Sequence, residues 1–312
     1  MNYQTKRLFT SLRLNTIFAI RSYFKRASTS SFLPKVSRFI NKHLYRIGLG
    51  SSINRYDNSL TLYSAFADKK LYSNYSVKEK FINFGSGAFF HNRWKNYDLP
   101  GNSSYYKSLQ GKPYKDFNPI NLCNEKLVVP ETDNSVALIY CSHTLEHLDK
   151  ESSIRFINEC HRILKKGGVL RVALPNTKND FYLLRCAMNQ SDVPEDLKKN
   201  YLQDSASVVL GDTKKLDLAN IIELMRKSSF DSYKFYKESI SKHPEMSRFE
   251  ENNPERHINY WDFDNLTIVM REIGFEAIIP TYQGSSVAQP FCNLHVFDNT
   301  ESHISFYADI IK

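Results

Sequence analysis

Residues 136–175, VALIYCSHTLEHLDKESSIRFINECHRILKKGGVLRVALP, contain the succession of segments that decides the fold class. VALIYCS at 136–142 predicts a buried strand. The next segment predicts a helix that begins after Asp149, whose side chain accepts hydrogen bonds from a first helical turn, and ends at Gly167–Gly168. VLRVALP then predicts a second buried strand, stopped by Pro175. A strand, a crossover helix and another strand indicate a parallel sheet.

Apolar runs on both sides extend this pattern. Further strands are predicted at KFINF (80–84), WKNYDL (94–99), FNPINL (117–122), EAIIPTY (276–282) and HISFYADII (303–311). DFDNLTIVMREIGF (262–275) predicts a capped amphipathic helix, and residues 178–255 are polar and helical in pattern. We therefore expect an α/β fold with a doubly wound, mostly parallel, Rossmann-like sheet, an antiparallel final strand and a helical insertion.

The composition is that of an ordinary globular chain. It has 312 residues, of which 41% are hydrophobic and 24% charged. Its five cysteines form no CxxC pair, which argues against a disulfide framework and favours a reducing compartment, the cytoplasm by default. No apolar run approaches the roughly 20 residues that a membrane span requires.

The net charge of +9 is concentrated at the N-terminus. Residues 1–56 contain eleven Lys or Arg and no acid, whereas the rest of the chain carries 31 basic and 33 acidic side chains. The body of the protein is therefore close to neutral, and we expect no specific nucleic-acid partner. We predict a basic N-terminal extension (1–56) followed by one domain (57–312) with residues 178–255 as a substrate cap.

The extension contains LPKVSRFINKHLYRIGL (33–49), which predicts a basic amphipathic helix. Its expected apolar face is formed by Val36, Ile40, Leu44 and Ile47, with Phe39 beside them. Three interpretations are open: peripheral contact of residues 1–50 with an anionic membrane, a mitochondrial transit peptide, or a helix that packs on the domain behind it.

Polar and small residues stand where the predicted strands end. Ligands of open parallel sheets lie beyond the carboxyl ends of the strands. Those positions hold Gly85-Ser86-Gly87, Asp98, Asn121-Leu122 and Ser142-His143. Glycines allow backbone to approach a ligand closely, and a carboxylate suits ribose hydroxyls. Asp98 comes only thirteen positions after Gly85, which leaves no room for a full helix.

These motifs resemble a known family. INFGSG, WKNYDL, IYCSHTLEHL and ECHRILKKGGVLRVALPN resemble the successive motifs of class I S-adenosylmethionine-dependent methyltransferases. The similarity is to the branch associated with bacterial surface-polysaccharide synthesis, and RHINYWDFDNLTIVMREIGF and HISFYADIIK resemble its last helix and strand. It covers about residues 80–176 and 255–312. It implies a methyl transfer from S-adenosylmethionine, with a glycan or glycan precursor as the small-molecule acceptor.

The resemblance also implies roles for residues. Gly85, Ser86 and Gly87 would approach the methionine part of the cofactor. Asp98 would hold the ribose hydroxyls, and Asn121 with Leu122 would lie along the adenine. Ser142 and His143 would line the floor near the sulfonium.

CSHTLEHL (141–148) also contains the pattern H-x-x-E-H, which one class of zinc peptidases uses. In those enzymes both histidines project from the middle of a long helix. Here His143 directly follows a predicted strand, and the helix cap comes later, at Asp149. We therefore predict no metal site, and expect Glu146 and His147 to hydrogen-bond the backbone of the turn.

Methyl transfer to a hydroxyl benefits from a general base, for which histidine is suited. The candidates are His143 and His257. His257 and Trp261 would share a face if their segment were helical, and Arg256 would contact an acidic substrate or lie in solvent.

Two other classes of function are open. A methyltransferase fold that no longer catalyses would serve as a binding or scaffold protein. An organellar methyltransferase would act on protein, RNA or a small molecule. A nicotinamide dehydrogenase fits the final strand and SHTLEHL poorly.

Overall fold

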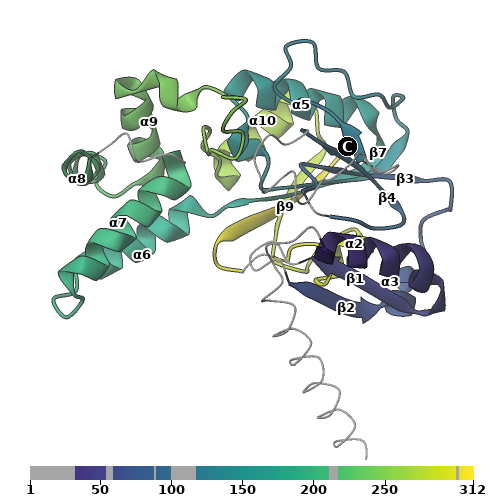
Figure 1. Cartoon of the computed structure of the whole chain (residues 1–312). Helices are drawn as coiled ribbons and strands as arrows, with labels where there is room; N and C mark the ends of the chain where they lie inside the picture. The colour runs from purple at the N-terminus through teal and green to yellow at the C-terminus, as the bar shows by residue number, and fades with distance from the viewer. Residues whose placement is uncertain (1–31, 54–58, 88, 100–116, 211–216, 300–301) are drawn as a thin grey trace, which may run out of the picture.

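A computed structural model describes residues 32–53, 59–87, 89–99, 117–210, 217–299 and 302–312 (Figure 1). Its centre is a seven-stranded sheet in the order β5-β4-β3-β6-β7-β9-β8. The strands are β3 (Lys80–Phe84), β4 (Trp94–Asp98), β5 (Phe117–Pro119), β6 (Val136–Ser142), β7 (Leu164–Pro175), β8 (Ala277–Thr281) and β9 (Ser305–Ile311). All neighbours from β5 to β7 pair in parallel, while β9 is antiparallel to β7 and β8. The predicted doubly wound sheet with an antiparallel final strand is confirmed.

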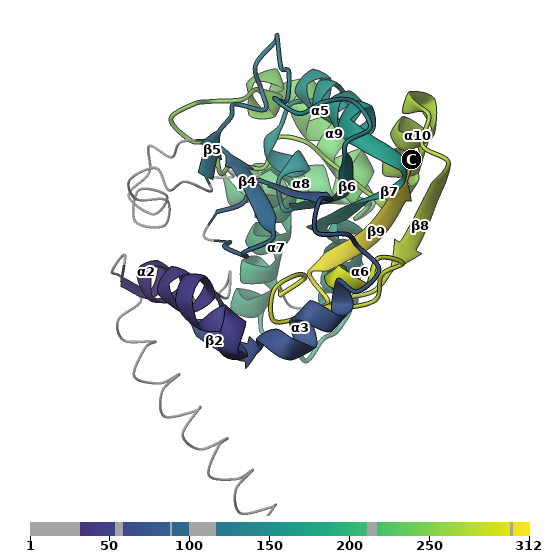
Figure 2. The ribbon, with the colours of Figure 1, turned by 90° about the vertical axis from the view of Figure 1, so that its right-hand side faces the viewer.

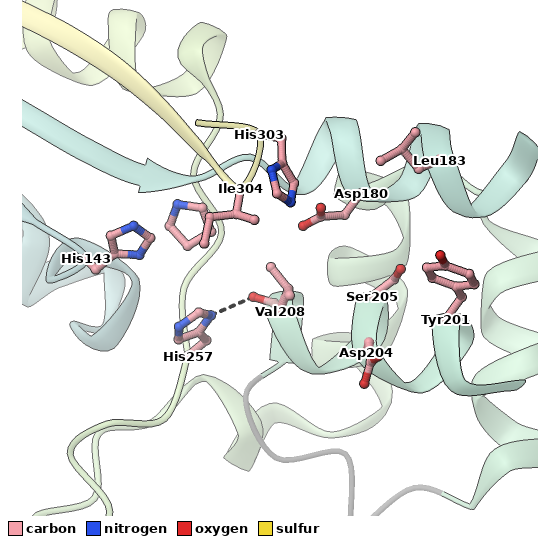
Figure 3. A pocket seen from close by; sticks show the side chains of 11 residues that line it. His143, Asp180, Leu183, Tyr201, Asp204, Ser205, Val208, His257, His303 and Ile304 are labelled. Carbon is pink, nitrogen blue, oxygen red and sulfur yellow. Dashed lines mark hydrogen bonds between the residues drawn. The ribbon is translucent and has the colours of Figure 1, made fainter. Parts of the chain in front are cut away.

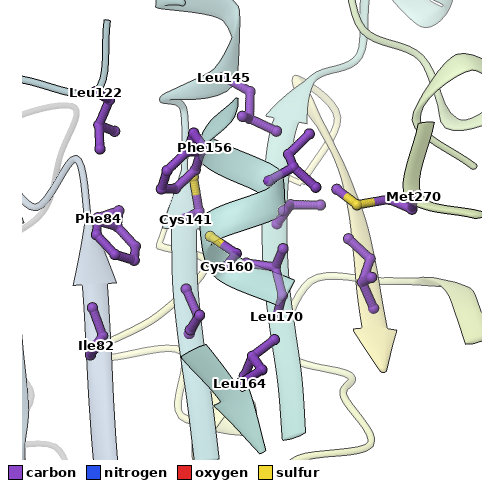
Figure 4. Packing of buried hydrophobic residues seen from close by; sticks show 14 of the residues in the cluster. Ile82, Phe84, Leu122, Cys141, Leu145, Phe156, Cys160, Leu164, Leu170 and Met270 are labelled. Atoms are coloured by element: carbon purple, nitrogen blue, oxygen red, sulfur yellow. The ribbon is translucent and has the colours of Figure 1, made fainter. Parts of the chain in front are cut away.

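Helices cover both faces of this sheet (Figures 1 and 2). One face packs against α5 (Lys150–Ile163) and α10 (Phe263–Ile273). Figure 4 shows this core, in which Ile82 and Phe84 meet Phe156 and Cys160 of α5. The opposite face packs against the N-terminal segment and the loop before β9. The strands are therefore apolar on both faces, as expected for a buried parallel sheet.

The crossover helix α5 begins as predicted and ends earlier. The Asp149 side chain accepts a hydrogen bond from Ser152 N at 2.8 Å and caps the helix. The helix stops at Ile163, so the predicted end at Gly167–Gly168 is wrong. Leu164 already pairs in the sheet, and Gly167 N donates to the carbonyl of Lys312 at 2.6 Å. Pairing with the last residue of the chain thus takes these glycines into β7.

Residues beyond the carboxyl end of β7 form a separate helical layer, at the left of Figure 1. It consists of α6 (Thr177–Met188), α7 (Glu195–Leu210), α8 (Leu218–Lys227) and α9 (Ser232–Lys242). These helices bury their own apolar cluster, which includes Phe181, Leu202 and Phe235. The helical character predicted for residues 178–255 is present, and this layer stands over the end of the sheet where ligands are expected.

The N-terminal segment packs on the domain. Helix α2 (Phe32–Phe39) continues through a π-helical turn (Ile40–Leu44) and a 3-10 turn (Tyr45–Ile47) into β1 (Leu49–Ile53). β1 pairs with β2 (Leu60–Ser64), on the far side of residue 56, and α3 (Ala65–Leu71) follows. The sequence did not predict this hairpin. Among the helices of the described residues, none is long and apolar enough to cross a membrane.

The buried side of this segment differs from the predicted one. Leu33, Ile40 and Tyr45 are buried, whereas Phe39 is 58% and Ile47 72% exposed. The Asn41 side chain fixes the orientation, because its amide nitrogen donates to the carbonyls of Ser51 and Phe90. For residues 32–47 the structure therefore agrees with the third interpretation, a helix that packs on the domain. Residues 1–31 lie outside the described residues.

Candidate active site

The glycine turn after β3 combines a tight contact with an open position. Gly85 and Gly87 have φ angles of +63° and +53°, which side chains rarely tolerate. A Cβ on Gly85 would lie 2.0 Å from Oγ1 of Thr144, whereas a Cβ on Gly87 would meet no described atom within 4 Å. Gly85 is thus required by packing, and Gly87 faces space that no other described residue fills. The same contact places the turn beside His143, the residue before Thr144.

Asp98, at the end of β4, lies against this turn. Its Oδ2 accepts a hydrogen bond from Gly87 N at 2.6 Å, and its Oδ1 accepts one from Leu99 N at 2.8 Å. The described residues between Gly87 and β4 form turns and no helix, as the short spacing predicted. The chain therefore brings the predicted glycines and the predicted acid together.

Asn121 and Leu122 follow the edge strand β5. The Asn121 side chain accepts a hydrogen bond from Cys123 N at 2.9 Å and stabilises the turn. Leu122 is only 5% exposed and packs near Phe84 in the core (Figure 4). These positions border the sheet's edge, with Leu122 facing inward.

Ser142 and His143 end β6. Ser142 is buried, and His143 takes a left-handed conformation with a φ of +49°. His143 N donates to the carbonyl of Ala173 at 2.8 Å, which fixes the residue over the end of β7. Its ring Nε2 lies 2.8 Å from Oγ of Ser305, and its Nδ1 lies 3.1 Å from Oε1 of Glu146.

The turn Leu145–His147 is a single 3-10 turn between strand and helix, which agrees with the argument against a zinc-peptidase helix. Glu146 is buried. Burial alone would raise the pKa of its carboxyl, but His143 and the neighbouring His147 bring the pKa down to about 2. Burial lowers the pKa of His147 to about 4. The expectation that Glu146 hydrogen-bonds backbone is wrong, because neither carboxylate oxygen has a hydrogen-bond partner among the described residues.

The segment around His257 is irregular, so the condition under which His257 and Trp261 would share a helical face is not met. Ile258 N and Asn259 N both donate to the carbonyl of Glu146, at 2.8 and 3.1 Å, and are thus diverted from helical bonds. Trp261 is buried in the core and donates from Nε1 to Leu145 O. Arg256 is also buried and donates to the carbonyls of Arg248 and Glu245. It therefore neither lies in solvent nor offers its guanidinium to a substrate, as the sequence had suggested.

A pocket of about 640 Å³ opens between the sheet's carboxyl end and the helical layer (Figure 3). Its lining residues are His143, Pro175, Asp180, Leu183, Tyr201, Asp204, Ser205, Val208, His257, His303 and Ile304. Both predicted bases, His143 and His257, thus share one cavity, although 114 positions separate them in the sequence. His257 Nδ1 lies 2.6 Å from the carbonyl of Val208.

The pocket contains residues that the sequence analysis missed. Asp180 on α6 faces the pocket beside His303 (Figure 3). Burial raises the pKa of Asp180 to about 6, and the charge of His303 opposes this shift. A carboxyl group with this pKa changes its charge near neutral pH. It can therefore accept a proton or bind a substrate in the pocket. The sequence indicated only that Asp180 would lie near the start of a helix, and gave no sign that it would line a pocket.

Replacing Asp180 by Asn should stabilise the protein at alkaline pH. Between pH 3.8 and 6 the unfolded chain loses its proton before the folded chain does, so the stability contributed by this group is lost as the pH rises. After allowance for partial exposure, the cost above pH 6 is about 1–2 kcal/mol. Thermal unfolding should therefore show Asp180→Asn to be more stable than the parent at pH 8 and equal to it at pH 4. Asp204→Asn, at an exposed position, is the control, and an equal gain at both pH values would contradict the assignment.

Comparison with known proteins gives one family match. Residues 108–172 match the model of a family described as a methyltransferase domain. This stretch includes β5, β6, α5 and most of β7, and with them His143 and Glu146. Comparison with curated protein sequences finds no match.

Solved structures give distant similarities. A SAM-dependent methyltransferase from Archaeoglobus fulgidus is 12% identical, with 79% of this chain and 93% of that chain covered and a TM-score of 0.38. One from Aquifex aeolicus is 11% identical, with 78% and 88% covered and a TM-score of 0.35. A possible histamine N-methyltransferase from Thermotoga maritima is 15% identical, with 79% and 88% covered and a TM-score of 0.36. The seven-stranded sheet of this chain has the mostly parallel, Rossmann-like order with an antiparallel strand that the sequence indicated.

Proposed function

We propose that the protein is an S-adenosylmethionine-dependent methyltransferase that O-methylates a glycan or glycan precursor. One observation carries the proposal. The glycine turn packs through Gly85 on Thr144, and the adjacent His143 lines the 640 Å³ pocket. A backbone site at the sheet's carboxyl end and a roomy pocket are therefore neighbours, as transfer between two bound molecules requires.

The residues present fit the cofactor. Gly87 leaves room where a side chain would stand, and the buried Ser86 Oγ has no hydrogen-bond partner among the described residues. We assign the methionine part to Gly85, Ser86 and Gly87, and the ribose hydroxyls to Asp98. Asn121 and Leu122 are assigned to the adenine edge and Ser142 to the floor. When bound, S-adenosylmethionine supplies an electrophilic methyl group, which passes to the acceptor oxygen as the carbon–sulfur bond breaks and its electron pair stays on sulfur.

His143 is suited to take the proton from the acceptor hydroxyl. If the imidazole becomes charged, the Glu146 carboxylate 3.1 Å from Nδ1 stabilises that charge. The carbonyl of Val208 holds His257 from the other side of the pocket, which favours a binding role for that ring over proton transfer.

The pocket's chemistry supports a sugar acceptor. Tyr201 presents an exposed ring against which a sugar face packs, while Asp180, Asp204 and Ser205 offer hydrogen-bond partners for hydroxyls.

Titration of the full-length chain with S-adenosylmethionine tests the proposal. Asp98→Ala should weaken binding by roughly ten- to a hundredfold, because hydrogen bonds to a charged group contribute about 1.5–3 kcal/mol and Gly87 N also loses its acceptor. Asp98→Asn keeps one acceptor oxygen, so its affinity for S-adenosylmethionine should fall by a smaller factor. No binding by the parent chain would support the alternative of an inactive scaffold, and equal constants for parent and Asp98→Ala would place the ribose elsewhere.

We also propose that the exposed side of α2 and its following turns contacts anionic membranes. Phe32, Phe39 and Ile47 are exposed there, and the basic residues Lys35, Lys42 and Arg46 are exposed on the same segment, which contains no acid. Apolar side chains among basic ones suit an anionic lipid surface.

Point variants test this contact better than deletion, since Leu33, Ile40 and Tyr45 are part of the core. Phe39→Ser with Ile47→Ser should abolish sedimentation with anionic vesicles at low salt and leave thermal stability unchanged. Neutral vesicles should bind neither protein. Exposed Ile268 on α10 provides the control variant, Ile268→Ser. Undiminished sedimentation of the double variant would exclude this surface.

A further inference from the structure

Three side chains from two distant segments converge behind the pocket. Glu146 and His147 belong to the turn after β6, and His257 belongs to the irregular segment before α10. One potential ligand atom from each lies within 4.8 Å of the others. The His147 and His257 rings are 4.9 Å apart between centroids, and His147 Nε2 is 3.9 Å from Oε1 of Glu146.

Hydrogen bonds fix the proton positions of both imidazoles. His147 Nδ1 lies 3.1 Å from the carbonyl of Arg256, and His257 Nδ1 lies 2.6 Å from the carbonyl of Val208. A carbonyl only accepts, so each Nδ1 must carry a hydrogen. In the neutral rings, Nε2 then holds a lone pair. A backbone carbonyl on Nδ1 is also the usual way in which proteins orient a metal-binding histidine.

The carboxylate in the cluster lacks the partners that its burial demands. Glu146 is only 2% exposed, and neither oxygen accepts a hydrogen bond from the described residues. His143 Nδ1 lies 3.1 Å from Oε1 and pairs with it when the ring is charged, whereas Oε2 has no hydrogen-bond partner among the described residues. A buried carboxylate with this one contact remains under-satisfied, and two lone pairs on nearby rings add to the cost. The cluster is therefore complementary to a cation.

We propose that Glu146, His147 and His257 bind a divalent transition-metal ion, with Zn²⁺ as the best match. Two imidazole nitrogens and one carboxylate form a donor set of catalytic zinc sites, which leave a further position open. Metal–ligand distances of about 2.0–2.2 Å put tetrahedral ligands about 3.4 Å apart. The side chains must therefore close by about an ångström on binding.

Backbone hydrogen bonds already hold the two segments that carry the proposed ligands close together. Ile258 N and Asn259 N donate to the carbonyl of Glu146, and Trp261 Nε1 donates to that of Leu145. These bonds tie the segment carrying His257 to the turn carrying the other two ligands. The site differs from the H-x-x-E-H pattern, because its second histidine is His257 and not His143. The prediction of no metal site was based on that local pattern alone.

Of the three ligands, His257 also lines the pocket, so an ion held there would lie beside the proposed acceptor site. This role rests on the proposed function: the ion would make an acceptor hydroxyl more acidic, and His143 would take the proton. The acceptor would then be one that offers an oxygen ligand, such as a sugar hydroxyl.

The metal site is tested by titrating the full-length, chelator-treated chain with Co²⁺, a spectroscopic substitute for Zn²⁺, without S-adenosylmethionine or acceptor. One ion per chain should give the visible absorption of a low-coordinate site, and Zn²⁺ should displace it. Glu146→Gln, His147→Gln and His257→Gln should each abolish that absorption. His303→Gln, in the same pocket and outside the cluster, is the matched control and should keep it.

Absence of the absorption from the parent chain would overturn the proposal, whatever the variants do. So would unchanged Co²⁺ affinity in His257→Gln. S-adenosylmethionine binding is measured separately on the chelator-treated chain. Loss of cofactor binding with Co²⁺ binding intact would reject the proposed function and leave the metal site standing, and the reverse result would reject the metal site alone.

Discussion

Gly87→Val should abolish S-adenosylmethionine binding, with an affinity loss of about a hundredfold or more. A Cβ on Gly87 meets no described atom within 4 Å, so the new side chain would fill the space assigned to the methionine part of the cofactor. Calorimetric titration of the folded variant measures the effect.

Gly167→Val supplies a matched control for this variant. Gly167 also has a positive φ, +71°, and a Cβ there would also meet no atom of the described residues within 4 Å. Both substitutions therefore impose similar backbone strain, of order 1–3 kcal/mol. Only the variant in the turn after β3 should lose the cofactor. Equal binding by Gly87→Val and the parent would show that the cofactor lies elsewhere.

Arg171→Met should destabilise the fold by about 3–5 kcal/mol. Arg171 lies fully buried on β7, opposite Asp309 of β9, and its guanidinium donates to Asp309 at 2.9 Å and to Asp298. Without the arginine, two buried carboxylates have no positive partner, which is far more costly than the loss of an exposed pair. Burial already raises the pKa of Asp298 while Arg171 opposes that shift.

Urea unfolding measures this loss. Arg155→Met is the control, because the half-buried Arg155 forms a long ion pair, 3.9 Å, with the exposed Glu151, and loss of that pair should cost about 0–1 kcal/mol. A loss of similar size in both variants would mean that the buried network contributes no more than a surface ion pair.

Local patterns in the sequence determined most of the sheet and its helices. Strand positions followed from short apolar runs, since a strand buried on both faces has no polar alternation to obscure it. The Asp149 and Asp262 caps and the Gly274 stop were predictable because each acts within one helical turn. That Gly87 and Asp98 lie close together could be predicted from the parallel topology alone, because the carboxyl ends of parallel strands meet at one edge of the sheet.

The rest depended on contacts between distant residues. The amides of Ile258 and Asn259, beside His257, bond to the Glu146 carbonyl, more than 100 positions away. The same contact brings His257 to His147, so no spacing in the sequence could reveal the proposed metal ligands. Asp180 shares the pocket with Tyr201 of α7 and with His303, so its surroundings depend on segments far apart in the sequence. The order of elements was thus encoded locally, whereas the composition of the pocket was decided by tertiary packing.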